Sequence, residues 1–185
     1  MANLGAYAWL EKEPGPRILR EALRHFGVVE VSGDGDNRTI LAWARELGLN
    51  QYKHDETAWC GLFMALCCRR SGYEIPRTPL WALSWKNWGR RAREPMLGDV
   101  LVFWRKVIDP HTHKPALYGH VGLYIGEDLR AFHVYGGNQD NQVCVKRIAR
   151  GRLVAARRCP WPKGQPRNVR KIVLSSFGGL STEEA

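Results

Sequence analysis

The sequence lacks the cysteine pattern of a disulfide framework or of a structural zinc site. It has five cysteines, an odd number, and no two of them form a CxxC pair. Secreted disulfide scaffolds and four-cysteine zinc sites depend on even sets of cysteines at regular spacings. We therefore expect free thiols, and a reducing cytoplasm is the simplest place of synthesis.

Long hydrophobic runs are also absent. No stretch of 18 apolar residues occurs, and Met1–Lys12 has no basic start followed by an apolar core. These absences argue against a transmembrane segment and against a secretory signal peptide. If the protein acts outside the cytoplasm, we expect another process to deliver it there.

Acidic residues are fewer than basic ones. The chain has 28 Lys and Arg against 18 Asp and Glu, a net charge of +10 at pH 7. A positive field attracts polyanions, but no nucleic-acid-binding motif accompanies it, so we expect no specific nucleic-acid partner. Near the C-terminus, Lys163, Arg167, Arg170 and Lys171 either hold an anionic polymer or are simply solvated.

The order of apolar patterns predicts an α+β domain. Apolar residues at helical spacing predict three helices. The first covers residues 17–26, and the second follows Asn37 as its capping residue. The third runs from about Thr57 to Ser71, with Asp55 or Thr57 as its cap. Strand-like segments follow at Asp99–Trp104, Gly119–Ile125, Arg130–Tyr135, Val143–Arg147 and Leu153–Arg157. Helices first and strands second indicate an antiparallel sheet. We divide the chain into a lead-in of residues 1–16, a domain of 17–159 and a basic, partly flexible tail of 160–185.

Cys60 is the candidate nucleophile. It lies in DETAWCGLF, in the first turn of the third predicted helix, where the partial positive charge of a helix start stabilises a thiolate. Gly61 is expected to keep the approach to the sulfur open. A cysteine near a helix start is more often a buried structural residue, so Cys60 needs a catalytic partner.

His120 supplies that partner. It lies in YGHVGLYIG, at the start of a predicted strand, and an imidazole can take the thiol proton and return it to the leaving amine. Two residues further on compete to orient the imidazole. Asn138, in GGNQ just past the next predicted strand, is one, and His133, within that strand, is the other.

Other histidines and several tryptophans could form metal or carbohydrate sites. Asp109, His111, His113 and His120 carry metal-ligand atoms, but Pro110 and Pro115 indicate a loop and the spacing matches no zinc motif, so we expect no metal and no other cofactor. Three tryptophans occur at helical spacing, Trp81, Trp85 and Trp88. They either belong to the hydrophobic core or form the wall of a groove that stacks on sugar rings. Together with Trp59, they are the tentative substrate groove.

Five segments in order resemble a known family. DETAWCGLF, SWKNWG from Ser84, PMLGDVLVF from Pro95, GHVGLYIG and GGNQ are similar to the CHAP and NlpC-type peptidoglycan hydrolases of the papain-like superfamily, in their phage- and prophage-associated, endolysin-like branch. The resemblance covers about Pro16 to Arg158. It implies a papain-like fold, with the nucleophile helix packed on a five- to six-stranded antiparallel sheet.

The same resemblance implies roles for the site residues. Cys60 is the nucleophile, its backbone N–H an oxyanion donor, and His120 the base. Asn138 matches the polar orienter of CHAP members, whereas His133 falls close to the second histidine of NlpC-type members. The sequence departs from papain just before the cysteine, where His54–Glu56 stands in place of a glutamine. The insertion Lys106–Tyr118 is longer than is usual in the family and is a candidate lid or specificity loop.

The implied activity is cleavage of amide or peptide bonds in bacterial peptidoglycan, as an amidase or an endopeptidase. We expect a monomer that binds peptidoglycan and anionic cell-wall polymers. Without a signal peptide, it would reach the wall or periplasm through a holin, by injection or after lysis. The alternative is a non-catalytic cell-wall-binding or virion component on the same fold.

Overall fold

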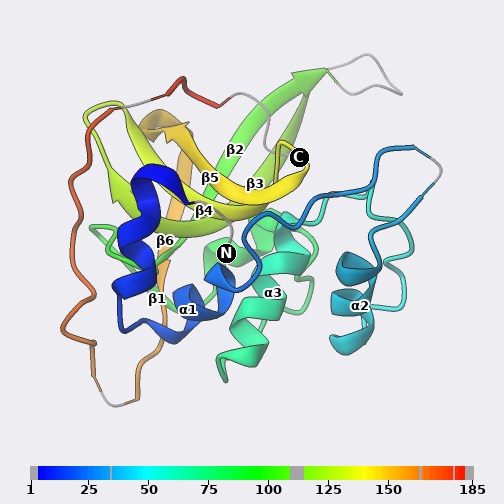
Figure 1. Ribbon diagram of the computed structural model, residues 1–185, viewed down its shortest axis with the longest axis horizontal. Helices are drawn as coiled ribbons and strands as arrows, with labels where there is room; N and C mark the ends of the chain where they lie inside the picture. Colours follow the sequence, from blue (N-terminus) through cyan, green and yellow to red (C-terminus); the bar gives the residue numbers. More distant parts are fainter. Residues whose placement is uncertain (1–3, 34, 109–114, 163, 177, 182–185) are drawn as a thin grey trace.

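The computed structural model describes residues 4–33, 35–108, 115–162, 164–176 and 178–181 (Figure 1). Helical elements come first: η1 Gly5–Lys12, α1 Arg17–Leu23, α2 Arg38–Glu46, α3 Cys60–Arg70 and η2 Ala82–Asn87. They are followed by β1 Arg90–Arg91, β2 Val100–Ile108, β3 Pro115–Glu127, β4 Ala131–Gln139, β5 Gln142–Ala149, η3 Arg150–Arg152 and β6 Leu153–Arg158. The six strands form one antiparallel sheet in the order β1-β6-β2-β3-β4-β5, which confirms the predicted α+β class.

The helix starts follow local capping chemistry in one case and tertiary contacts in another. Asn37 caps α2 as predicted, because its Oδ1 accepts a hydrogen bond of 2.8 Å from the Thr39 amide. The third helix begins at Cys60 rather than near Thr57, and Trp59 is its N-cap residue. Asp55 does not cap α3, because its carboxylate instead accepts hydrogen bonds from the amides of two residues in the preceding loop, Val31 and Asn37.

α3 is the central helix of the core. Every residue from Cys60 to Cys68 is buried, as expected for a helix that is enclosed on all sides rather than amphipathic. It packs on β3 and β4 and is contacted by α1 and α2, and Figure 1 shows these helices gathered on one side of the sheet. α3 is therefore held against β3 and β4.

The sheet separates two hydrophobic clusters because side chains alternate along each strand. On β2, Val100 and Val102 pack with the helices, whereas Leu101 and Phe103 belong to a smaller cluster on the other face. The paired strands β2 and β3 extend beyond the rest of the sheet in Figure 1. Much of the predicted insertion Lys106–Tyr118 is thus strand, and its tip, with Asp109, His111 and His113, lies outside the described residues.

The C-terminal segment runs along the sheet instead of leaving it. Val173 forms a parallel bridge with Glu127, and the Ser181 amide donates to the Arg147 carbonyl over 2.8 Å. Arg170 pairs with Glu13 at 2.8 Å, which joins this segment to the residues after η1. In the part of the chain that the structure describes, no helix has the length and apolar character needed to cross a membrane.

Candidate active site

Cys60 is the first residue of α3 and is 2% exposed. The amide groups of the first helical turn have no partner within the helix, so they present partial positive charge near the thiol. Gly61 has a different role from the predicted one. A Cβ there would lie 2.3 Å from the Pro79 carbonyl oxygen, so the glycine lets the chain at Pro79 and Leu80 approach the start of α3 closely.

His120 lies on β3 and is completely buried. Its Nε2 is 3.0 Å from Oε1 of Gln139, the last residue of β4. The amide nitrogen of Gln139 donates to the carbonyl oxygens of Cys144 at 2.6 Å and Val134 at 3.2 Å. These two bonds fix the orientation of the amide, so its oxygen must accept from His120, and the neutral imidazole carries its proton on Nε2.

Two adjacent glycines connect His120 with the start of α3. A Cβ at Gly136 would lie 3.4 Å from His120 Nε2. A Cβ at Gly137 would lie 2.6 Å from a ring carbon of Trp59 and 2.7 Å from Phe63 Cβ. The end of β4 therefore lies beside both the histidine and the first turn of the helix that carries Cys60, and at Gly137 the close approach leaves no room for a side chain.

Asn138 forms none of the described hydrogen bonds with His120. It lies in β4 with a φ of +55°, just before the turn at Asp140 and Asn141, whose φ values are +52° and +59°. Its side chain is buried, and its Oδ1 has no hydrogen-bond partner among the described residues. The register of β4 and β5 is irregular between Gly136 and Gln139, and this irregularity turns Gln139 toward His120 where regular alternation would have turned Asn138.

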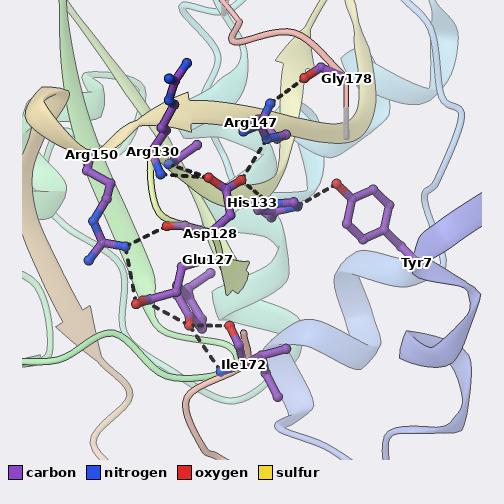
Figure 2. Close-up of polar contacts among 11 residues, drawn as sticks. Tyr7, Glu127, Asp128, Arg130, His133, Arg147, Arg150, Ile172 and Gly178 are labelled. Carbon is purple, nitrogen blue, oxygen red and sulfur yellow. Dashed lines mark hydrogen bonds and ion pairs between the residues drawn. The ribbon is translucent and has the colours of Figure 1, made fainter. Parts of the chain in front are cut away.

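His133 belongs to a separate buried network, shown in Figure 2. Its Nε2 is 2.9 Å from Asp128 Oδ2, and its Nδ1 is 2.7 Å from the Tyr7 hydroxyl. Arg147 donates to the same Asp128 oxygen at 2.8 Å and also to the Gly178 carbonyl. Both ring nitrogens of His133 therefore serve a network that joins η1, β4, β5 and the C-terminal segment.

The charges in this network shift its pKa values. The Arg147 guanidinium, ahead of the other neighbours, holds the pKa of Asp128 well below its usual range. Burial lowers the pKa of His133 and raises that of Tyr7 to about 12. A neutral imidazole that accepts from Tyr7 and donates to an ionised Asp128 satisfies all of these groups.

Three of the four tentative groove tryptophans lie in the core. The indole N–H groups of Trp59, Trp85 and Trp88 donate to Glu30 Oε2, the Pro79 carbonyl and the Glu74 carbonyl, at 3.0, 3.0 and 2.7 Å. The segment is a 3-10 helix, in which residues three apart share a face, so Trp85 and Trp88 turn inward together. Trp81 precedes the helix and is 58% exposed.

The remaining cysteines are thiols in apolar surroundings. None of the five cysteines forms a disulfide. Burial raises the pKa of Cys144 to about 11 and of Cys159 to about 12, and it raises those of Cys67 and Cys68 well above the usual value. Cys60 differs from them in standing at a helix start.

Glu30 contacts Trp59, the N-cap residue of α3, and has two acidic neighbours. Glu30 accepts the hydrogen bond from Trp59, and its pKa is raised by burial and then by the charges of Asp55 and Glu56. Within the described ranges, no three histidine, cysteine or acidic side chains are grouped so that they could hold a metal ion.

In comparisons with known proteins, no protein-family model matches the chain and no curated protein matches its sequence.

Proposed function

We propose that the protein is a papain-like cysteine hydrolase that cleaves amide or peptide bonds in bacterial peptidoglycan. The observation that carries the proposal is the hydrogen bond between His120 and Gln139. It leaves the lone pair of the neutral imidazole on Nδ1, which is the protonation state that a general base needs. The glycine pair at the end of β4, in contact with both His120 and the first turn of α3, supports the pairing with Cys60.

The chemistry is acyl transfer. The Cys60 thiol gives its proton to His120 Nδ1, and the thiolate forms a bond to the carbonyl carbon of the scissile amide. The backbone N–H of Cys60 stabilises the oxyanion. His120 then protonates the leaving nitrogen as the C–N bond breaks, and it removes a proton from the water that hydrolyses the thioester.

Gln139 takes the place that the sequence assigned to Asn138 or His133. We assign it as a positioning residue: it acts through His120 and does not touch the reacting atoms. Its amide is held by two backbone carbonyls, so it can act only as an acceptor toward the imidazole. The resemblance in GGNQ and in the segments around Cys60 and His120 supports peptidoglycan as the proposed substrate class.

The test uses purified peptidoglycan with the wild-type protein, Cys60→Ala and His120→Ala. Wild type should release soluble fragments, and mass spectrometry of their new ends should identify the bond as an amidase or endopeptidase target. Both variants should lose release almost completely. Release by either variant at the wild-type rate would exclude this mechanism.

One observation favours a second candidate function, a non-catalytic wall-binding component. Cys60 and His120 are both almost fully buried, so a substrate has to displace the residues that cover them. In that case Cys60 should react with a small alkylating reagent no faster than the other four cysteines. A sedimentation assay would then show binding to peptidoglycan without release of fragments.

A further inference from the structure

A second concave site lies at the far end of α3. It is a cleft of about 630 Å³ between the residues after α3, the chain just before β1, and the segment that follows β6. Its lining includes Arg17, Tyr73, Glu74, Trp88, Trp161 and Pro162. Because α3 has 11 residues, its length separates this cleft from Cys60 by about 15 Å along the helix axis.

The walls of this cleft are aromatic and proline rings. Tyr73 and Trp88 meet edge to face, with ring centroids 6.2 Å apart, and Trp161 is half-buried beside them. The indole N–H of Trp88 is donated to the Glu74 carbonyl, and the indole nitrogen of Trp161 is buried. Ring surfaces rather than polar ring atoms therefore face a ligand, and such surfaces suit the C–H faces of sugar rings.

The rim carries charge of both signs. Arg17 and Glu74 are exposed and line the same cleft, so it favours neither a polyanion nor a polycation. Together they offer donors and acceptors for hydroxyl and amide groups. A proline-rich peptide would also suit stacked rings, but its backbone carbonyls need an exposed donor, and neither the Trp88 nor the Trp161 indole N–H is exposed in the cleft.

We propose that this cleft binds a neutral glycan, and that its occupant is the N-acetylhexosamine strand of the cell wall. The choice of this glycan rests on the proposed function. The cleft would hold the sugar chain at one end of α3 while Cys60, at the other end, acts on an attached peptide. Wall binding and bond cleavage would then use separate surfaces of one domain.

The test is a titration of the full-length Cys60→Ala protein with N-acetylchitohexaose, followed by tryptophan fluorescence and calorimetry. Saturable binding is expected. Trp161→Ala, made in the same background, should weaken it about tenfold through loss of one stacking surface. Leu129→Ala is the control, since Leu129 is an exposed apolar side chain that does not line the cleft, and it should bind as the parent does.

Glu74→Ala gives a second variant that spares the fold, because Trp88 bonds to the backbone of Glu74 and not to its carboxylate. It should weaken binding about threefold by loss of one rim acceptor. Absence of binding at millimolar oligosaccharide, equal losses in Leu129→Ala, or tighter binding of a proline-rich peptide at Trp161 would overturn the proposal. Because the oligosaccharide contains no peptide, its binding is independent of whether the wild-type protein hydrolyses peptidoglycan.

Discussion

At the scale of single residues, Gln139 determines which nitrogen of His120 carries the proton. The amide donates to two backbone carbonyls and accepts from the imidazole, so no flip of the amide satisfies the same set of partners. Gly136 lies close to the same side chain, since an added Cβ would be 3.2 Å from Gln139 Oε1. The proposed base and its positioning residue are thus held by backbone contacts as well as by side-chain chemistry.

Gln139→Ala should lower kcat on peptidoglycan about a hundredfold with a smaller change in KM, because the imidazole loses its fixed tautomer. The pH profile of kcat should shift at the same time, which loss of packing alone would not cause. Asn138→Gly is the matched control. It removes the neighbouring side chain and suits a φ of +55°, so its activity should stay within about twofold of wild type. A loss in Asn138→Gly equal to that in Gln139→Ala would restore Asn138 as the orienting residue.

At the scale of elements, the position of α3 depends on close backbone approach at its first turn. The chain before η2 passes over Gly61, and β4 ends against Trp59 and Phe63. These contacts hold Cys60 at a helix start that is enclosed by the loop and the sheet. An added methyl group at Gly61 should therefore destabilise the fold, whereas one at a glycine with open surroundings should not.

Gly61→Ala should reduce the free energy of unfolding by about 1–3 kcal/mol, because its Cβ would lie 2.3 Å from the Pro79 carbonyl oxygen. Urea denaturation measures this difference. Gly151→Ala is the matched control, since a Cβ there meets nothing within 4 Å, and it should be neutral within about 0.5 kcal/mol. Equal stability of the two variants would show that the loop does not press on α3.

At the scale of the whole molecule, buried histidines make stability depend on pH. Burial lowers the pKa of both His25 and His133 below the usual value near 6.5. Between the lowered pKa and the normal one, the unfolded chain binds protons that the folded chain does not, so stability falls as the pH drops below about 6.5. For His133, a proton on Nδ1 would also meet the Tyr7 hydroxyl that now donates to it.

The melting temperature should accordingly fall between pH 7.5 and pH 5.5. His133→Asn should be less stable at pH 7.5, because it breaks the bridge between Tyr7 and Asp128, and should show a shallower fall over this range. Thermal unfolding of both proteins at the two pH values measures the slopes. Parallel slopes would mean that His133 does not contribute to the pH dependence.

Much of the fold could be predicted from local patterns. The five longer strands and the cap at Asn37 follow from the period of the apolar residues and from side-chain chemistry. Local patterns failed where tertiary contacts decide. α3 begins later than predicted because Asp55 accepts hydrogen bonds from a distant loop instead of capping the helix. The segment after β6 packs on the sheet, although its composition resembles that of a flexible tail.

The candidate site divides in the same way. Motifs predict Cys60 and His120, whereas the role proposed for Gln139 rests on the structure, because the sequence points to its neighbour Asn138. Regular strand alternation puts Asn138 on the same face as Gly136, and only the irregular register and the left-handed backbone at Asn138 exchange the two side chains. Gln139 is part of the GGNQ motif, but the sequence alone does not give the strand register that turns its side chain toward His120.

The most direct test of the central claim is the pH dependence of Cys60 alkylation by iodoacetamide, followed by peptide mass spectrometry with the other four cysteines as internal references. We predict that Cys60 reacts fastest near neutral pH, with an apparent pKa below the value of about 8.5 for a free thiol, and that His120→Ala removes this advantage. Reaction of Cys60 at the rate of Cys144, or an unchanged profile in His120→Ala, would contradict the pairing of Cys60 with His120.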